Sequence, residues 1–126
     1  MHLVPADDPI LRRVCRVDFT VSLRQINNMF FLLREKGGLA LAAPQVGIDA
    51  RLFVTAWGAV FINPIITGRL DAAEGDEGCL SLPGVVARKR RWQHILLADG
   101  REYDGIQAVV IQHECEHLNG ILITDP

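Results

Sequence analysis

Near its C-terminal end the chain reads GIQAVVIQHECEHLNG, residues 105–120. His113 and His117 are four positions apart in this stretch, so on a helix their side chains lie one above the other on the same face. Two imidazoles placed in this way can hold one metal ion. Glu114 is one position further round the helix, where a carboxylate can act as a general base and not as a third ligand. The alternative is a histidine pair with a purely structural role.

The residues before the histidines favour a buried helix. Ile106 and Val110 are spaced so that, with the two histidines, they form one stripe along a helix. A buried histidine pair needs partners for its ring nitrogens, and a metal ion is a suitable one. We therefore expect a helix from Ile106 to Leu118 whose Ile106, Val110 and histidine side chains are all buried. Asn119-Gly120 is a typical helix end.

The composition is that of an ordinary globular domain. The chain has 126 residues, of which 49% are hydrophobic and 22% charged, and its net charge is −2. Such a balance does not favour nucleic acid as a specific partner. The basic run Arg88-Lys89-Arg90-Arg91 is expected to be a solvated strand edge. No apolar run is long enough to span a bilayer and the first residues do not resemble a signal peptide, so we expect a cytoplasmic protein without a membrane partner.

The remaining segments predict an α+β fold with a mostly antiparallel sheet of short strands around the C-terminal helix. Ser22 and Gln25 form a capping box before an N-terminal helix that runs from Leu23 to Glu35. Residues 38–47 are expected to be a loop. Short strands are expected at residues 51–55, 60–63, 65–70, 85–87 and 92–97, with a hairpin turn at Asp99-Gly100 and a return strand at 101–103. Ile121 to Ile123 are expected to form a last short strand.

A metal site of the catalytic type needs a third protein ligand, and the segment around Cys79 is the best candidate. Gly78 lets the backbone approach closely, and a thiolate is a strong ligand for a borderline-soft divalent ion. The alternative for Cys79 is a buried structural cysteine. Cys15 is expected to be a packing residue, and Cys115 lies on a different helical face from the two histidines.

Three short motifs follow one another along the chain. They are Gly38-Leu39-Ala40-Leu41-Ala42-Ala43-Pro44-Gln45, Glu77-Gly78-Cys79-Leu80-Ser81 and Gln112-His113-Glu114-Cys115-Glu116-His117. In this order they resemble the three motifs of the peptide deformylases. The segment Asp8-Pro9-Ile10-Leu11-Arg12 is also similar to the N-terminal segment of that family. The resemblance covers nearly the whole chain and implies a single catalytic domain over residues 1–126.

The resemblance implies a function and a set of roles. The chain would remove the formyl group from the N-terminal formylmethionine of peptides and nascent chains. Cys79, His113 and His117 would hold one divalent ion, Fe(II) or Zn(II), with Ni(II) or Co(II) also acceptable. Glu114 would move protons, and the amide of Gln45 and the backbone N–H of Leu80 would stabilise the oxyanion.

The same resemblance implies supporting roles. The backbone of Leu39, Ala40 and Gly78, together with Gly38, would bind the substrate as an added strand. Glu77 would pair with Arg91 and steady the segment that carries the cysteine. A weak association with ribosomes is also implied.

The sequence departs from the family pattern at three places. Ala40 stands where the family has a second glycine, which would narrow the substrate groove. Glu116 stands where aspartate is usual, at a position outside the ligand set. The sequence ends at Pro126, soon after the histidine helix, whereas many members continue into a further helix or tail, so we expect no ribosome docking through such a tail.

Two other functions remain to be compared with this one. A zincin-like metallopeptidase would carry its third ligand C-terminal to the histidines, but Asp125 is the only carboxylate there. A metal-binding deformylase-like module without turnover would keep the ligands, and only Ala40 favours it.

Overall fold

The computed structural model describes residues 1–126 and confirms the α+β class. Two helices and six strands follow each other with two short 3₁₀ helices. In chain order they are η1 Pro9–Arg12, α1 Leu23–Lys36, β1 Ala40–Ala42, η2 Ala43–Val46, β2 Leu52–Thr55, β3 Val60–Ile62, β4 Ile66–Cys79, β5 Leu82–Leu97, β6 Glu102–Asp104 and α2 Gly105–Leu118. Neither helix has the length and apolar character needed to cross a membrane.

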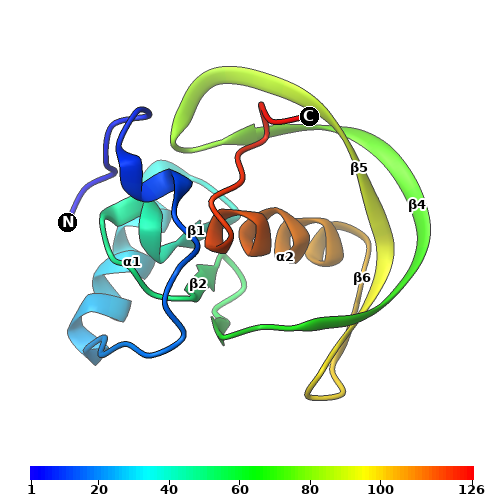
Figure 1. Ribbon diagram of the computed structural model, residues 1–126, viewed down its shortest axis with the longest axis horizontal. Helices are drawn as coiled ribbons and strands as arrows, with labels where there is room; N and C mark the ends of the chain where they lie inside the picture. The colour runs from blue at the N-terminus through cyan, green and yellow to red at the C-terminus, as the bar shows by residue number, and fades with distance from the viewer.

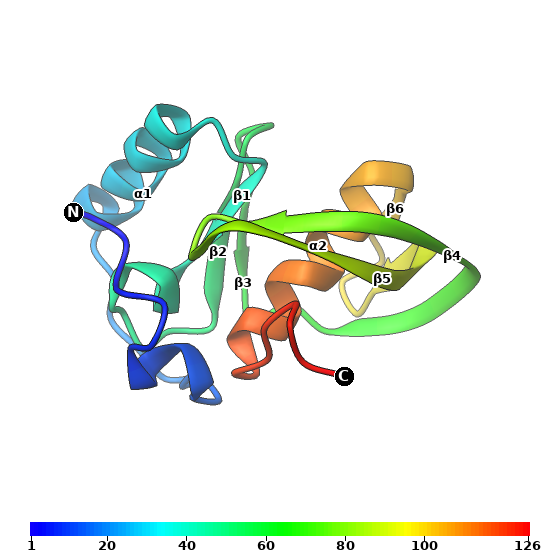
Figure 2. The same ribbon diagram turned by 90° about the horizontal axis from the view of Figure 1, so that it is seen from above.

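The strands form two antiparallel sheets on either side of α2. One sheet has the order β1-β2-β3 and the other the order β4-β5-β6. Figure 1 shows β4 and β5 as a long curved ribbon that passes around α2, and Figure 2 shows α1 on the far side of the first sheet. The predicted central position of the C-terminal helix is therefore confirmed.

The strands β4 and β5 are much longer than expected, with 14 and 16 residues. Residues 85–87 and 92–97 were predicted as separate strands, but they belong to one strand that continues through the basic run. Arg88 and Arg90 point to solvent, and the exposed side of the ribbon pairs Arg88 with Asp76 and Glu74 of β4. Lys89 and Arg91 lie on the more buried side, so the strand alternation continues through the basic run.

The prediction that the whole basic run is solvated is consequently wrong for Arg91. Its side chain is only 6% exposed, because β5 directs it inward towards α2. An arginine in such a place must be paired, since an isolated buried charge is strongly unfavourable. Its partners belong to the candidate site described below.

Helix α1 covers the outer side of the first sheet. Ser22 caps it with the predicted capping box, and Gly37 ends it in the left-handed conformation at φ 66°. Met29, Leu32 and Leu33 on its inner face pack against a cluster of buried residues from β1, η2, β2 and the loop between them: Leu41, Ala43, Ala50, Leu52 and Val54.

A second core cluster lies between the two sheets and α2. Phe53 of β2 stacks on Phe61 of β3, with ring centroids 4.7 Å apart. Ile95 and Leu97 of β5 pack in the same cluster, together with Ala108, Ile111 and Leu118 of α2. The helix that carries the histidines is thus fixed by apolar contacts with both sheets.

The segment 38–47 was predicted to be a loop, but it contains β1 and η2. Strand β1 pairs with β2 only, so its other edge is free of strand partners. The side chain of Gln45 in η2 accepts a hydrogen bond from the N–H of Ala42 at 2.9 Å, which ties η2 to the end of β1. Small residues can form a strand here because Ala42 and Ala43 are fully buried against the core.

The residues after α2 do not form the predicted strand. Ile121 follows the helix end at Asn119 and Gly120, while Leu122 and Ile123 are buried in a turn. Asp125 in this turn accepts from the N–H of Leu122 and pairs with Arg12 of η1 at 2.7 Å. The segment is therefore held by a turn and an ion pair, and not by strand pairing.

Gly120 provides a stability prediction. It has φ 72°, and a Cβ placed on it would lie 2.5 Å from the carbonyl carbon of Arg12. We expect Gly120→Ala to lower the free energy of unfolding well beyond the roughly 1–2 kcal/mol of a left-handed alanine, because backbone must also move. Gly100→Ala is the control, since φ is 92° there and the added Cβ would meet nothing. Denaturant unfolding of both variants measures the difference; equal losses would contradict the close approach of Gly120 to Arg12.

Candidate metal centre

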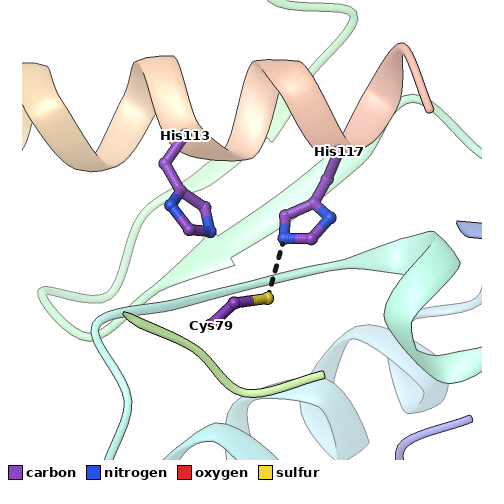
Figure 3. A group of neighbouring side chains, drawn as sticks. All are labelled: Cys79, His113 and His117. Carbon is purple, nitrogen blue, oxygen red and sulfur yellow. Dashed lines mark hydrogen bonds between the residues drawn. The ribbon is translucent and has the colours of Figure 1, made fainter. Parts of the chain in front are cut away.

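The three residues that the sequence singled out as metal ligands lie together. Ligand atoms of Cys79, His113 and His117 are all within 4.8 Å of one another. The Sγ atom of Cys79 is 3.4 Å from Nε2 of His117, and the rings of the two histidines are 5.0 Å apart at their centroids. Figure 3 shows both rings projecting from α2 towards the cysteine.

The local structure explains why these atoms converge. His113 and His117 follow one another by one helical turn on the face of α2 that looks towards the β4–β5 ribbon. Cys79 is the last residue of β4, just before the two-residue turn Leu80-Ser81 into β5. A cysteine at the end of a strand is held more rigidly than one in a long loop, so the thiol position is defined by the ribbon itself.

Glu77 defines the orientation of His113. Its Oε1 atom is 3.0 Å from Nδ1 of His113. Burial disfavours the ionised form of Glu77, but hydrogen bonds from His113 and Arg91 outweigh it and lower the pKa to about 2. An ionised carboxylate can only accept, so Nδ1 carries a proton and Nε2 is the ring atom directed towards the other two candidate ligands.

Arg91 binds the other side of Glu77. Its Nε and Nη2 atoms donate to the two carboxylate oxygens of Glu77, each at 2.9 Å. Its Nη1 atom donates to Glu116 on α2 at 2.8 Å. The guanidinium therefore links the end of β4 to the helix.

Glu114 lies beside the ligands without a firm hydrogen bond. One of its oxygens is 3.8 Å from Nε2 of His113, and the other, Oε1, is buried without a partner. Burial raises the pKa of Glu114 to about 7. A carboxyl group with such a pKa can accept and release protons near neutral pH.

The pKa values of the two histidines shift in opposite directions. Burial lowers the pKa of His113, but its hydrogen bonds to Cys79 and Glu77 and the nearby charge of Glu114 outweigh this and raise the pKa to about 10. Burial and then the charges of His113 and Arg91 lower the pKa of His117 to about 3. The acidic and thiol groups around His113 thus favour a positive charge at that ring.

Gln45 and Leu80 lie next to the ligands. Nε2 of Gln45 donates to Ser81 at 3.0 Å and lies 3.7 Å from Sγ of Cys79. Leu80 is held by close packing, since a Cβ on Gly38 would lie 2.8 Å from its Cδ1 atom. The glycine therefore allows the start of β1 to approach the turn after Cys79.

A pocket of about 450 Å³ opens beside Cys79 and His113. Its apolar wall comes from Leu39, Leu80, Val85, Ile106, Val109 and Val110. Ile106 was expected to be buried like the rest of its helical stripe, but it is 67% exposed because it lies at the pocket and not under a strand. Cys79, His113, Glu114 and Gln45 line the polar side of the same pocket.

The family description that matches the chain, over residues 1–126, is polypeptide deformylase. The chain belongs to this family. A peptide deformylase from Clostridium perfringens is 38% identical over 135 residues, which cover 94% of this chain and 92% of the relative. The peptide deformylase structure from Thermotoga maritima has a TM-score of 0.88 at 33% identity and covers 97% of this chain and 93% of its own. The peptide deformylase structure from Thermus thermophilus has a TM-score of 0.87 at 38% identity, and the match covers 98% of this chain and 83% of the Thermus thermophilus chain.

Membership in the deformylase family confirms the predicted function. The family is metal-dependent and removes the formyl group from N-terminal formylmethionine, so this chain is a metallohydrolase. The relatives do not favour a zincin-like peptidase or a module without turnover.

Sequence reasoning missed three features of this deformylase site. It did not predict the bond between Glu77 and His113, the contact of Glu116 with Arg91, or the contact of Gln45 with Ser81. The helical position of Glu116 was a usable signal for the second one. His113 and Glu116 are three positions apart, so both side chains lie on one side of α2.

Proposed function

We propose that Cys79, His113 and His117 hold one divalent ion with which this chain deformylates the N-terminal formylmethionine of peptides and nascent chains. The observation that carries the proposal is the convergence of one sulfur and two imidazole nitrogens beside an apolar pocket. The donor set fits the group, because ligands of one tetrahedral ion are roughly 3.5 Å apart, close to the 3.4 Å between Cys79 and His117.

The nature of the donors restricts the metal. One thiolate and two imidazoles suit Fe(II) or Zn(II), and would also accept Ni(II) or Co(II). The ion supplies Lewis acidity, which lowers the pKa of water to about 7 and polarises a carbonyl group. Metal analysis of anaerobically purified protein, together with turnover of formyl-Met-Ala-Ser, tests this part of the proposal; metal-loaded protein without turnover would contradict it.

Glu114 is the proposed general base and acid. Its carboxylate is next to His113, is 3% exposed, and has one oxygen without a partner. In this position it accepts the proton of the attacking water and later passes it to the leaving amine of methionine. Burial keeps the pKa of the group close to the pH at which both transfers occur.

Gln45 and Leu80 are the proposed oxyanion donors. The amide nitrogen of Gln45 has two hydrogens, which it donates to Ser81 at 3.0 Å and to the sulfur of Cys79 at 3.7 Å; the longer of these two bonds is the one that a substrate oxygen would replace. The backbone N–H of Leu80 follows Cys79 in the turn, and Leu80 lines the same pocket as Gln45. Such donors stabilise the charge that develops on the formyl oxygen, and each is worth about 10²–10³ in rate.

The substrate is proposed to bind as an additional strand beside β1. Leu39 and Ala40, at the start of β1 with its free edge, and Gly78 near the end of β4 all line the same pocket. The apolar wall around Val110 and Ile106 suits the unbranched side chain of methionine. Ala40 lines the pocket where the family has glycine, so its methyl group narrows this groove.

A weak association with ribosomes stays a prediction. The exposed basic side chains on the outer face of β5, Arg88 and Arg90, could contribute to it. Their charge is offset by Glu74 and Asp76 on the neighbouring strand. Salt-sensitive co-sedimentation with ribosomes would detect such an association.

Replacing Cys79 is expected to remove the thiolate ligand. Cys79→Ser should weaken Co(II) binding by more than about 100-fold, beyond the 10–100-fold known for residues that only support ligands. The sulfur-to-cobalt charge-transfer absorption of the wild-type protein should be absent from the variant. Absorption spectra during a Co(II) titration measure both effects.

Cys115→Ser is the matched control for this experiment. Cys115 lies on the same helix as the two histidines, but it packs against the core cluster with Phe53 and Phe61. The charge-transfer band should persist in this variant. A band that survives in Cys79→Ser would rule out the proposed ligand set.

A further inference from the structure

A chain of charged groups extends from the metal centre to the surface. His113 donates from Nδ1 to Glu77, Arg91 donates to Glu77 from the opposite side, and Glu116 accepts from Arg91. Arg91 and Glu77 are 6% and 10% exposed, whereas the side chain of Glu116 is 31% exposed. Glu116 is thus the outer end of a chain whose inner end is a proposed ligand.

One oxygen of Glu77 is shared between two donors. Its Oε1 atom accepts from Nδ1 of His113 at 3.0 Å and from Nη2 of Arg91 at 2.9 Å. The two donors therefore compete for the same negative charge. The strength of the interaction between Arg91 and Glu77 depends on which other negative charges neutralise the guanidinium.

Glu116 is the only other carboxylate that balances it. Its Oε1 atom is 2.8 Å from Nη1 of Arg91, while both oxygens of Glu77 are occupied by Nε and Nη2. One buried cation is thus divided between two anions. Without the charge of Glu116, Glu77 alone would have to neutralise Arg91, and it would be a weaker acceptor for His113.

We propose that Glu116 is a positioning residue of the metal centre that acts through Arg91 and Glu77 on His113. By balancing Arg91 from the surface side, it leaves enough charge on Glu77 to orient His113 and to raise its strength as a ligand. The side chain of Glu116 hydrogen-bonds to Arg91 and to none of the three proposed ligands. The inference rests on the proposed metal site. It assigns Glu116, three residues after His113, a role in metal affinity.

The experiment is a comparison of Zn(II) affinities by chelator competition for the wild-type protein, E116Q, E77Q and the double variant. Glutamine in E116Q can still accept from Arg91, so the change removes the charge and keeps the hydrogen bond. The matched control is E74Q, because Glu74 faces Arg88 at 3.6 Å on the exposed side of the same ribbon. Thermal unfolding of each metal-free protein reports the stability separately.

E116Q is expected to bind Zn(II) about tenfold more weakly, at the lower end of the 10–100-fold range of supporting residues, while E74Q binds as the wild type does. The double variant should bind as weakly as E77Q alone, since both changes act on one path. Wild-type affinity in E116Q, even with reduced stability, would show that the pair with Arg91 is only structural. Losses that multiply in the double variant would show that Glu116 acts without Glu77, and would also overturn the inference. Failure of the wild-type protein itself to bind Zn(II) would instead remove the proposed function.

Discussion

Glu114→Gln is expected to lower kcat by about 10²–10⁴-fold while the protein keeps its metal. Glutamine has nearly the same shape as glutamate, so the buried place beside His113 remains filled. It cannot accept a proton, however, and the carboxyl group whose pKa is raised by burial to about 7 is lost. The measurement combines bound metal per chain with turnover of formyl-Met-Ala-Ser.

Glu102→Gln is a suitable control for this loss of activity. Glu102 is an exposed carboxylate on β6, at the far end of the second sheet from the β4–β5 turn. Turnover of that variant should equal that of the wild-type protein. If metal-loaded Glu114→Gln retained wild-type turnover, the role proposed for Glu114 would be wrong.

Phe53→Ala is expected to cause the largest loss of stability, about 3–5 kcal/mol. Phe53 is completely buried and stacks on Phe61 in the cluster that joins both sheets to α2. The surrounding backbone belongs to strands and a helix, so it cannot collapse to fill the space. Denaturant unfolding of metal-free protein measures the loss without a contribution from metal binding.

Phe31→Ala provides the comparison on the surface. Phe31 lies on α1 and is 73% exposed, so truncation should change the free energy of unfolding by less than about 0.5 kcal/mol. Similar losses in the two variants would mean that the cluster around Phe53 does not hold the sheets and α2 together.

Much of the site could be predicted because its chemistry is local in sequence. The spacing of His113 and His117 defines a helical face by itself, and Cys79 follows a glycine in a motif of its own. The structure places all three together. Their role as ligands stays a prediction until metal is measured.

The pair of Glu77 with Arg91 was expected from the family resemblance, but it could not be read from strand register. In the ribbon, Arg91 lies opposite Ala73, and Glu77 lies opposite Ala87. Only the length of the arginine side chain, directed inward and along the strand, brings it to Glu77. The position of Glu116 relative to both depends on how α2 packs against the ribbon, which is a tertiary property.

The length of β4 and β5 was missed for a different reason. Charged residues dominate the middle of both strands, and hydrophobic alternation is the usual signal for a strand. In this ribbon, the alternation is between exposed and buried charges. Arg88 faces water near Asp76, while Arg91 is buried between two carboxylates. A pattern of that kind looks like a solvated run when hydrophobicity alone is considered.

The place of α2 in the chain has a consequence for biosynthesis. Every other helix and strand precedes Gly105, yet Ala108, Ile111 and Leu118 complete the core that both sheets share. During synthesis on the ribosome, the two sheets therefore cannot complete their shared core until α2 has been made. Until then, Phe53 and Ile95 lack their packing partners on the helix. The two histidines arrive on that same helix. This enzyme acts on nascent chains, yet it cannot be active while it is itself nascent. Its activity begins only after α2, which completes the fold, has left the exit tunnel of the ribosome.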